Sequence, residues 1–141
     1  MALYGNKGKY LTEKGDWVQS KYEKAVANFL YENDISYEYD KPYHFLDGEI
    51  AHPDFRLIDY DVFIEVWGMT GDPLYYESKK LKQEKYRKDG TKLIELFPKG
   101  GRLNFKYLIW VKFKELTGKV LPTKTKWSYY PPENFPIREY D

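Results

Sequence analysis

The first clear hydrophobic pattern is an apolar face between residues 16 and 33. Its members recur at spacings of three and four residues, which is typical of an amphipathic helix. Asp16 is the candidate N-cap, and Gln19 follows three residues later, as in a capping box. The turn-prone segment "ENDIS" predicts the end of the helix. The face comprises Val18, Tyr22, Ala25, Val26, Phe29 and Leu30.

The next part of the chain has the shorter periodicity of strands. Residues 36–45 alternate tyrosines with polar residues, which predicts a half-buried strand, and Pro42 indicates an edge or the strand's end. Two compact apolar runs follow at residues 54–57 and 61–66. The short segment "IDYD" between them predicts a tight turn.

The second half of the chain predicts a helix, a strand and a helix. Asp72-Pro73 is a favourable helix start, so residues 73–89 form a lysine-rich helix that ends at Gly90. "TKLIELFP", residues 91–98, is a compact apolar strand. Residues 103–118 then form an amphipathic helix that Gly118 stops. The order is α-β-β-β-α-β-α, and a helix that crosses over between the last two strands implies a parallel pair in a mixed sheet. We therefore expect a small α/β sandwich.

The length of 141 residues is that of one domain with a single core. The core covers about residues 15–118, and residues 119–141, rich in Pro and Tyr, are expected to form an arm packed on the body. The chain has no cysteine, which excludes a disulfide scaffold and a thiolate zinc site and suits an intracellular protein. No apolar run approaches the roughly 20 residues of a membrane span, so no membrane partner is expected.

Charge is distributed unevenly although the net charge is only +1. Residues 31–72 hold eleven Asp and Glu against two Lys and Arg, and residues 73–126 hold fifteen Lys and Arg against five acids. An acidic segment followed by a basic one could form a cation site beside a surface for a polyanion. Two ordinary solvated faces would give the same pattern.

Carboxylates lie inside the apolar strands and need compensation. Asp54 opens one run and Glu65 lies within "VFIEVW", where an unpaired charge is costly. A divalent cation such as Mg²⁺ or Mn²⁺ would compensate these negative charges, because such an ion takes carboxylate oxygens and water as ligands. The Val66 carbonyl and Glu23 on the first helix are further candidate ligands. The alternatives are a lysine partner for Glu65, a turn role for Asp54 and a solvated Glu23.

These motifs together resemble the PD-(D/E)XK nuclease superfamily. The resemblance covers about residues 15–118: "SKYEKAVANFLYENDISYEYDKPY", "HPDF", "VFIEVWG", a lysine-rich helix and "GTKLIELFP" follow in order. Pro53-Asp54 matches the PD, Glu65 the acidic residue of the second half-motif, and Glu23 a glutamate that many members carry. The resemblance implies a restriction-endonuclease-like fold, a three-layer sandwich with a mixed central sheet, and metal-dependent hydrolysis of DNA.

The sequence departs from the superfamily at Trp67, where the half-motif has a lysine. An indole N–H is a single neutral donor and cannot replace that cation. Some members carry the lysine on the following helix, and the resemblance favours Lys82 here, four residues before Tyr86. Lys79 and Gln83 are the alternatives. The resemblance thus implies that Glu23, Asp54, Glu65 and Lys82 form the catalytic set.

The basic second half suits contacts with DNA phosphates that read no sequence. Some of the fifteen tyrosines and four tryptophans could stack on bases, although most are expected in the core. The alternatives to an endonuclease are an inactive nucleic-acid-binding module of the same fold and a protein-interaction domain. A homodimer or a larger nucleoprotein complex is compatible with the sequence. The candidate contacts are Lys79, Lys80, Gln83, Lys85 and Arg102.

Overall fold

The computed structural model describes residues 8–68, 73–98 and 104–126. It is a mixed α/β structure built on a four-stranded sheet in the order β3-β6-β7-β8. The β3/β6 and β6/β7 pairs are antiparallel, and the β7/β8 pair is parallel. The strands of this sheet are β3 (Tyr37–Tyr39), β6 (Phe55–Leu57), β7 (Val62–Val66) and β8 (Lys92–Leu96). The helices are α1 (Lys21–Glu32), α2 (Pro73–Asp89) and α3 (Phe105–Thr117).

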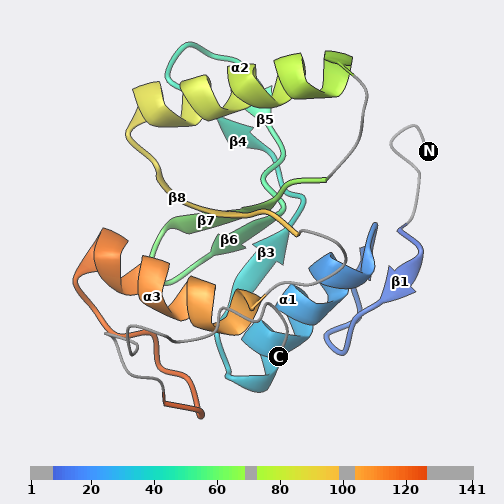
Figure 1. Cartoon of the computed structure of the whole chain (residues 1–141), viewed down its shortest axis with the longest axis vertical. Helices are drawn as coiled ribbons and strands as arrows, with labels where there is room; N and C mark the ends of the chain where they lie inside the picture. Colours follow the sequence, from blue (N-terminus) through green and yellow to red (C-terminus); the bar gives the residue numbers. More distant parts are fainter. Residues whose placement is uncertain (1–7, 69–72, 99–103, 127–141) are drawn as a thin grey trace.

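The helices cover both faces of the sheet. Figure 1 shows α2 over one face and α1 with α3 over the other. The α2 crossover between β7 and β8 makes that strand pair parallel, as the order of elements predicts. Gly90, with φ +70°, ends α2 at the predicted residue because a left-handed conformation costs glycine little.

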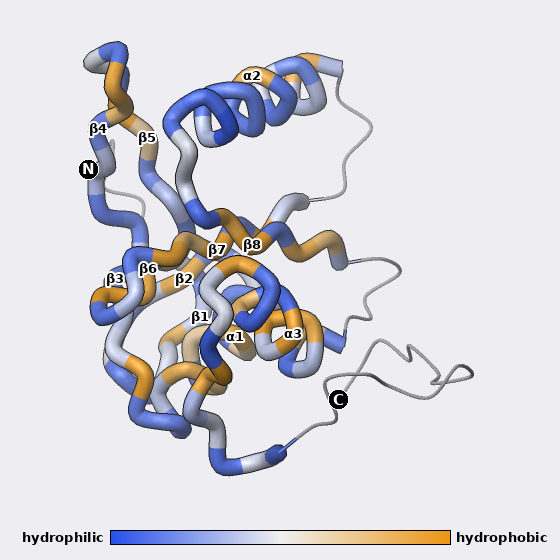
Figure 2. Tube along the Cα trace, turned by 90° about the vertical axis from the view of Figure 1, so that its left-hand side faces the viewer, coloured by the Kyte–Doolittle hydropathy of each residue, from blue (hydrophilic) through white to orange (hydrophobic). Residues whose placement is uncertain are grey.

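The two faces differ in polarity. The face toward α1 and α3 is apolar and holds the main core, in which large side chains are fully buried. The face toward α2 carries charged residues among aromatic ones, which contact side chains of that helix. Figure 2 shows a largely hydrophilic α2 above hydrophobic strands. Main-core members include Leu30, Phe55, Ile64, Leu96, Ile109 and Phe113.

The first helix starts later than the pattern predicts. Ser20 is the N-cap of α1, and its side chain accepts a hydrogen bond from the backbone N–H of Glu23. The prediction of a helix from residue 16 with Asp16 as N-cap is therefore wrong. Residues 17–18 instead form β2 (Trp17–Val18), which pairs with β1 (Tyr10–Leu11). Asp16 accepts a hydrogen bond from the Tyr37 hydroxyl at 2.9 Å, which joins this hairpin to the sheet.

The predicted strand over residues 36–45 is interrupted. Asp40 has φ +57°, and Pro42 follows it, so pairing stops after β3. The chain resumes as β4 (Tyr43–His44), which pairs with β5 (Ile50–Ala51) in a separate two-stranded sheet. Lys85 of α2 forms ion pairs with Asp47 and Glu49 in the loop of this hairpin. The hairpin is thereby fixed to α2.

The beginning of the predicted C-terminal arm packs on the body. Leu121 is fully buried in the main core, and the backbone N–H of Lys124 donates to the Asn33 side chain. Residues 127–141 of the arm lie outside the described residues. Within the described ranges, every helix is too short or too polar to span a bilayer.

Candidate functional site

The β6/β7 pair brings two carboxylates together. Phe55 lies opposite Ile64, so the preceding Asp54 and the following Glu65 face one another on the α2 side of the sheet. Asp54 Oδ2 accepts a hydrogen bond of 2.7 Å from the backbone N–H of Val66. The short "IDYD" turn sets this register, and a slip of one residue in either strand would move that strand's carboxylate to the opposite face.

Burial makes this pair electrostatically costly. It raises the pKa of Asp54 well above its usual value, and the charges of Glu65 and Glu23 raise that pKa further. Burial also raises the pKa of Glu65, although the Tyr86 hydrogen bond and the positive charge of Lys82 oppose this rise. A cation between the carboxylates would favour their ionised forms.

Glu23 reaches the pair from the opposite layer. It lies in the first turn of α1 and is only 8 % exposed. Its Oε1 atom accepts a hydrogen bond from the Tyr39 hydroxyl at 2.7 Å and another from the backbone N–H of Gln19 at 3.0 Å. Two donors hold one oxygen, and the side chain still raises the pKa of Asp54. Glu23 is therefore a buried carboxylate near the pair and not a solvated helix residue.

Helix α2 supplies two groups to Glu65. The Tyr86 hydroxyl donates to Glu65 Oε2 at 2.6 Å, and both side chains are buried. Lys82 lies one turn earlier on the same face of the helix, and its charge lowers the pKa of Glu65. Lys82, the lysine that the resemblance favours, therefore lies near enough to Glu65 for its charge to oppose the rise of that pKa.

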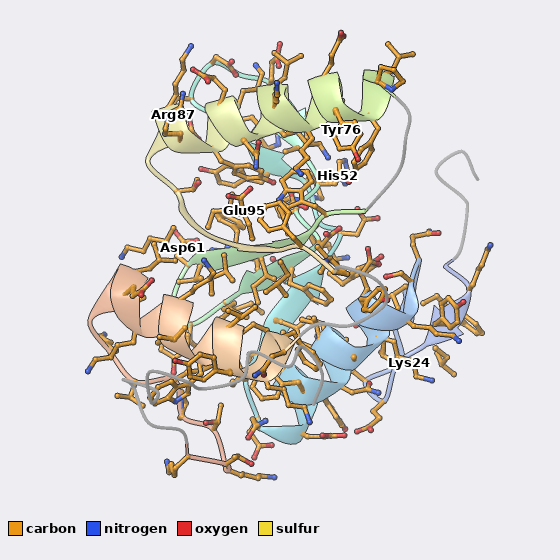
Figure 3. All side chains as sticks on the ribbon, viewed as in Figure 1. Lys24, His52, Asp61, Tyr76, Arg87 and Glu95 are labelled. Atoms are coloured by element: carbon orange, nitrogen blue, oxygen red, sulfur yellow. The ribbon has the colours of Figure 1, made fainter. Side chains whose placement is uncertain are left out.

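Trp67 is buried and forms a hydrogen bond to a fourth carboxylate, that of Glu95. Its indole N–H donates to Glu95 Oε2 at 2.8 Å, and Gln83 Nε2 donates to the same oxygen at 2.6 Å. Glu95 is the register partner of Glu65 in the parallel pair, so their side chains share a face. Figure 3 shows Glu95 between the sheet and α2.

Sequence reasoning did not select Glu95 as a site residue. The signal was present, because Glu95 lies within "KLIELF" as Glu65 lies within "VFIEVW". Its tertiary partners, Trp67 and Gln83, are what distinguish it from a surface glutamate.

The remaining candidate contacts are dispersed. The Lys79 ammonium lies over aromatic rings, Lys80 is exposed, and Lys85 is held by its two acidic partners. Gln83 is bound to Glu95. Arg102 lies outside the described residues.

The donor set suits a hard cation with few protein ligands. Within the described ranges, no group of three or more His, Cys, Asp or Glu side chains is arranged to hold a metal ion. Asp54 and Glu65 nevertheless present two carboxylates, and Mg²⁺ is commonly bound through one or two of these plus water and substrate oxygens. His52 lies 3.3 Å from the Asp40 carbonyl oxygen through Nδ1 (Figure 3). The backbone N–H of Asp40 donates in turn to the carbonyl oxygen of Asp54 at 3.1 Å, so His52 is linked to the site through Asp40.

Comparison of the chain with protein-family models, with curated proteins and with solved structures finds no match.

Proposed function

We propose that this protein is a metal-dependent endonuclease that hydrolyses DNA phosphodiester bonds, with Mg²⁺ or Mn²⁺ as cofactor. The observation that carries the proposal is the pairing of half-buried Asp54 with buried Glu65, whose pKa values are raised and to which Lys82 adds a positive charge. Strongly perturbed carboxylates beside a cation are typical of functional sites. The mixed sheet with helices on both faces is compatible with a restriction-endonuclease-like fold.

Each residue has a defined task in this proposal. Asp54 and Glu65 would hold the ion, with Glu23 and the Val66 carbonyl as supplementary ligands. The bound metal would activate water and neutralise charge on a phosphoryl oxygen. Lys82 would stabilise negative charge at the phosphate, which is the task of the lysine that Trp67 replaces. Tyr86 orients the Glu65 carboxylate through its hydrogen bond.

Burial of the carboxylates also argues for the cation. Each charged group in this layer lowers folding stability unless it is compensated. A site with no ligand gains nothing from the facing Asp54 and Glu65 carboxylates or from Glu23 near them. The basic helix α2 above them would face the DNA backbone, with Lys79 and Lys80 as phosphate contacts.

A second candidate is an inactive nucleic-acid-binding module of the same fold. The specific observation in its favour is that Trp67 is bound to Glu95 and offers no positive charge. This candidate predicts DNA binding without cleavage, and it predicts that Lys82 is dispensable.

The test uses purified protein with labelled linear, nicked, single-stranded and branched DNA in Mg²⁺, Mn²⁺ or EDTA. We expect cleavage that depends on the metal and is lost in Glu65→Gln, which retains an acceptor for the Tyr86 hydroxyl. Glu115→Gln, on the exposed side of α3, is the matched control. Absence of cleavage on all substrates, with no metal-induced thermal stabilisation, would refute the proposal.

A further inference from the structure

Three aromatic rings adjoin the carboxylates at the carboxyl ends of β7 and β8. Trp67 follows Glu65 by two residues, and Phe97 follows Glu95 by two residues. Since the two strands are paired in register and side chains alternate along a strand, both rings lie on the face that carries the carboxylates. They lie about 7 Å further along the strands, at about 3.3 Å per residue. Tyr76 approaches from α2 (Figure 3).

These rings surround one ammonium group. Lys79 Nζ lies 4.6 Å from the centroid of Phe97, 5.7 Å from that of Trp67 and 5.9 Å from that of Tyr76. Such distances are those of cation–π contacts. We call Trp67, Tyr76, Phe97 and Lys79 the aromatic rim.

The rim is open to solvent although it is apolar. Phe97 is 44 % exposed and Tyr76 is 40 % exposed, whereas Trp67 is buried below them. Within the described residues, the buried clusters of the core are formed by side chains other than these two rings. Exposed rings beside a site indicate a binding surface more than a packing role.

The charge beside the rings selects the kind of partner. Lys79 and the neighbouring Lys80 bring positive charge to the rim, which suits a phosphate backbone. Exposed ring faces suit unpaired bases, since a base in a duplex already stacks on its neighbours. Aromatic rings combined with cations are the usual means of binding single strands.

We infer that the aromatic rim binds unpaired nucleotides of a single strand next to the carboxylate site, with Phe97 and Tyr76 stacking on bases and Lys79 contacting phosphate. This inference rests on the proposed function and specifies its substrate class. The preferred substrates would be single-stranded DNA, or duplexes with an unpaired end or flap, and fully paired DNA would be a poor one.

Binding is measured without cleavage, so that the two proposals are tested separately. The Glu65→Gln protein in EDTA is titrated into fluorescein-labelled oligothymidylate and into a closed hairpin duplex with the same number of phosphates. Fluorescence anisotropy at one fixed salt concentration gives both affinities, because the electrostatic contribution depends on salt. Oligouridylate is a third probe that separates DNA from RNA.

We expect Phe97→Ala and Tyr76→Ala each to weaken oligothymidylate binding by about fivefold or more, in line with the usual loss of one stacking contact. Hairpin binding should change by less than about twofold, because phosphate contacts remain. Phe97→Leu keeps an apolar side chain of similar size but removes the ring, and should give the same selective loss. Leu81→Ala, which removes an exposed apolar side chain elsewhere on α2, is the control.

Equal losses on both probes, or no loss in Phe97→Ala and Phe97→Leu, would overturn the inference. Tighter binding to oligouridylate than to oligothymidylate would overturn the assignment to DNA. Ring-dependent binding by a protein that never cleaves would support the rim and refute the nuclease. If the protein cleaves every substrate equally well with and without the rings, the nuclease proposal is supported and the proposal for the aromatic rim is refuted.

Discussion

The indole of Trp67 donates a hydrogen bond of 2.8 Å to Glu95, and this contact explains a tryptophan where a catalytic lysine is expected. Trp67 is buried, and Gln83 donates to the same carboxylate oxygen. The Glu95 carboxylate therefore joins β8 to the end of β7 through Trp67 and to α2 through Gln83. The positive charge near Glu65 comes from Lys82 on α2 instead.

Replacing Trp67 should therefore affect stability more than chemistry. We expect Trp67→Phe to lower the free energy of unfolding by about 1–3 kcal/mol, since Glu95 loses one of two donors in a partly buried place. Metal-dependent cleavage by the folded fraction should fall by less than about tenfold. Urea unfolding and DNA cleavage measure the two effects. A loss of cleavage as large as that of Glu65→Gln would show that Trp67 takes part in the chemistry.

Lys82 should be essential for cleavage and Lys80 should not be. We expect Lys82→Ala to reduce the cleavage rate by about 10²–10³, the usual effect of removing one group that stabilises transition-state charge. Lys80→Ala, exposed on the same helix, should change the rate by less than about threefold. Single-turnover rates at saturating protein compare the two. Equal effects of the two substitutions would identify Lys82 as an ordinary DNA contact.

The raised pKa of Asp54 predicts how stability depends on pH. The folded state retains the proton to higher pH than the unfolded chain, in which an Asp has a pKa of about 4. In EDTA this contribution to stability is complete below that pH and is lost as the pH rises through the folded pKa. Glu65 acts in the same direction because its pKa is also raised. Thermal unfolding from acid to alkaline pH in EDTA should show this decline.

Removing the Asp54 charge should abolish this residue's contribution to the loss of folding stability at high pH. Asp54→Asn retains an oxygen acceptor for the Val66 N–H, and we expect a higher Tm than the parent at alkaline pH in EDTA. Mg²⁺ should stabilise the parent, by about 2.7 kcal/mol at one hundred times its Kd, and should leave the variant nearly unchanged. Glu115→Gln should behave as the parent does. Equal metal stabilisation of parent and Asp54→Asn would exclude Asp54 as a ligand.

The Tyr86 hydroxyl should stabilise the charged form of Glu65. Tyr86→Phe removes the donor from a buried carboxylate, and we expect the free energy of unfolding to fall by about 1–3 kcal/mol. The loss should be larger at alkaline pH than at acid pH, because the hydrogen bond lowers the pKa of Glu65 and its removal raises that pKa. Urea titrations of Tyr86→Phe and of exposed Tyr31→Phe test this. A loss that does not vary with pH would indicate packing alone.

Local patterns were sufficient for most of the fold. The apolar runs around Ile64 and Ile94, the Pro73 start and the Gly90 end predicted β7, α2 and β8 correctly, since these depend on side-chain periodicity and on backbone preferences of single residues. The first helix was placed too early because Val18 fits a helical face and is also buried in β2. Only long-range pairing with β1 separates these two possibilities.

Some features of the candidate site likewise follow from local sequence, and others follow only from the tertiary structure. The sequence by itself determined that Asp54 and Glu65 lie on adjacent strands, because a tight turn joins two apolar runs. The tertiary structure decided which residues surround them: Tyr86 and Lys82 at Glu65, and Trp67 with Gln83 at Glu95. These contacts depend on how α2 lies across the sheet. Packing between layers sets that position, and residue spacing along the chain does not encode it.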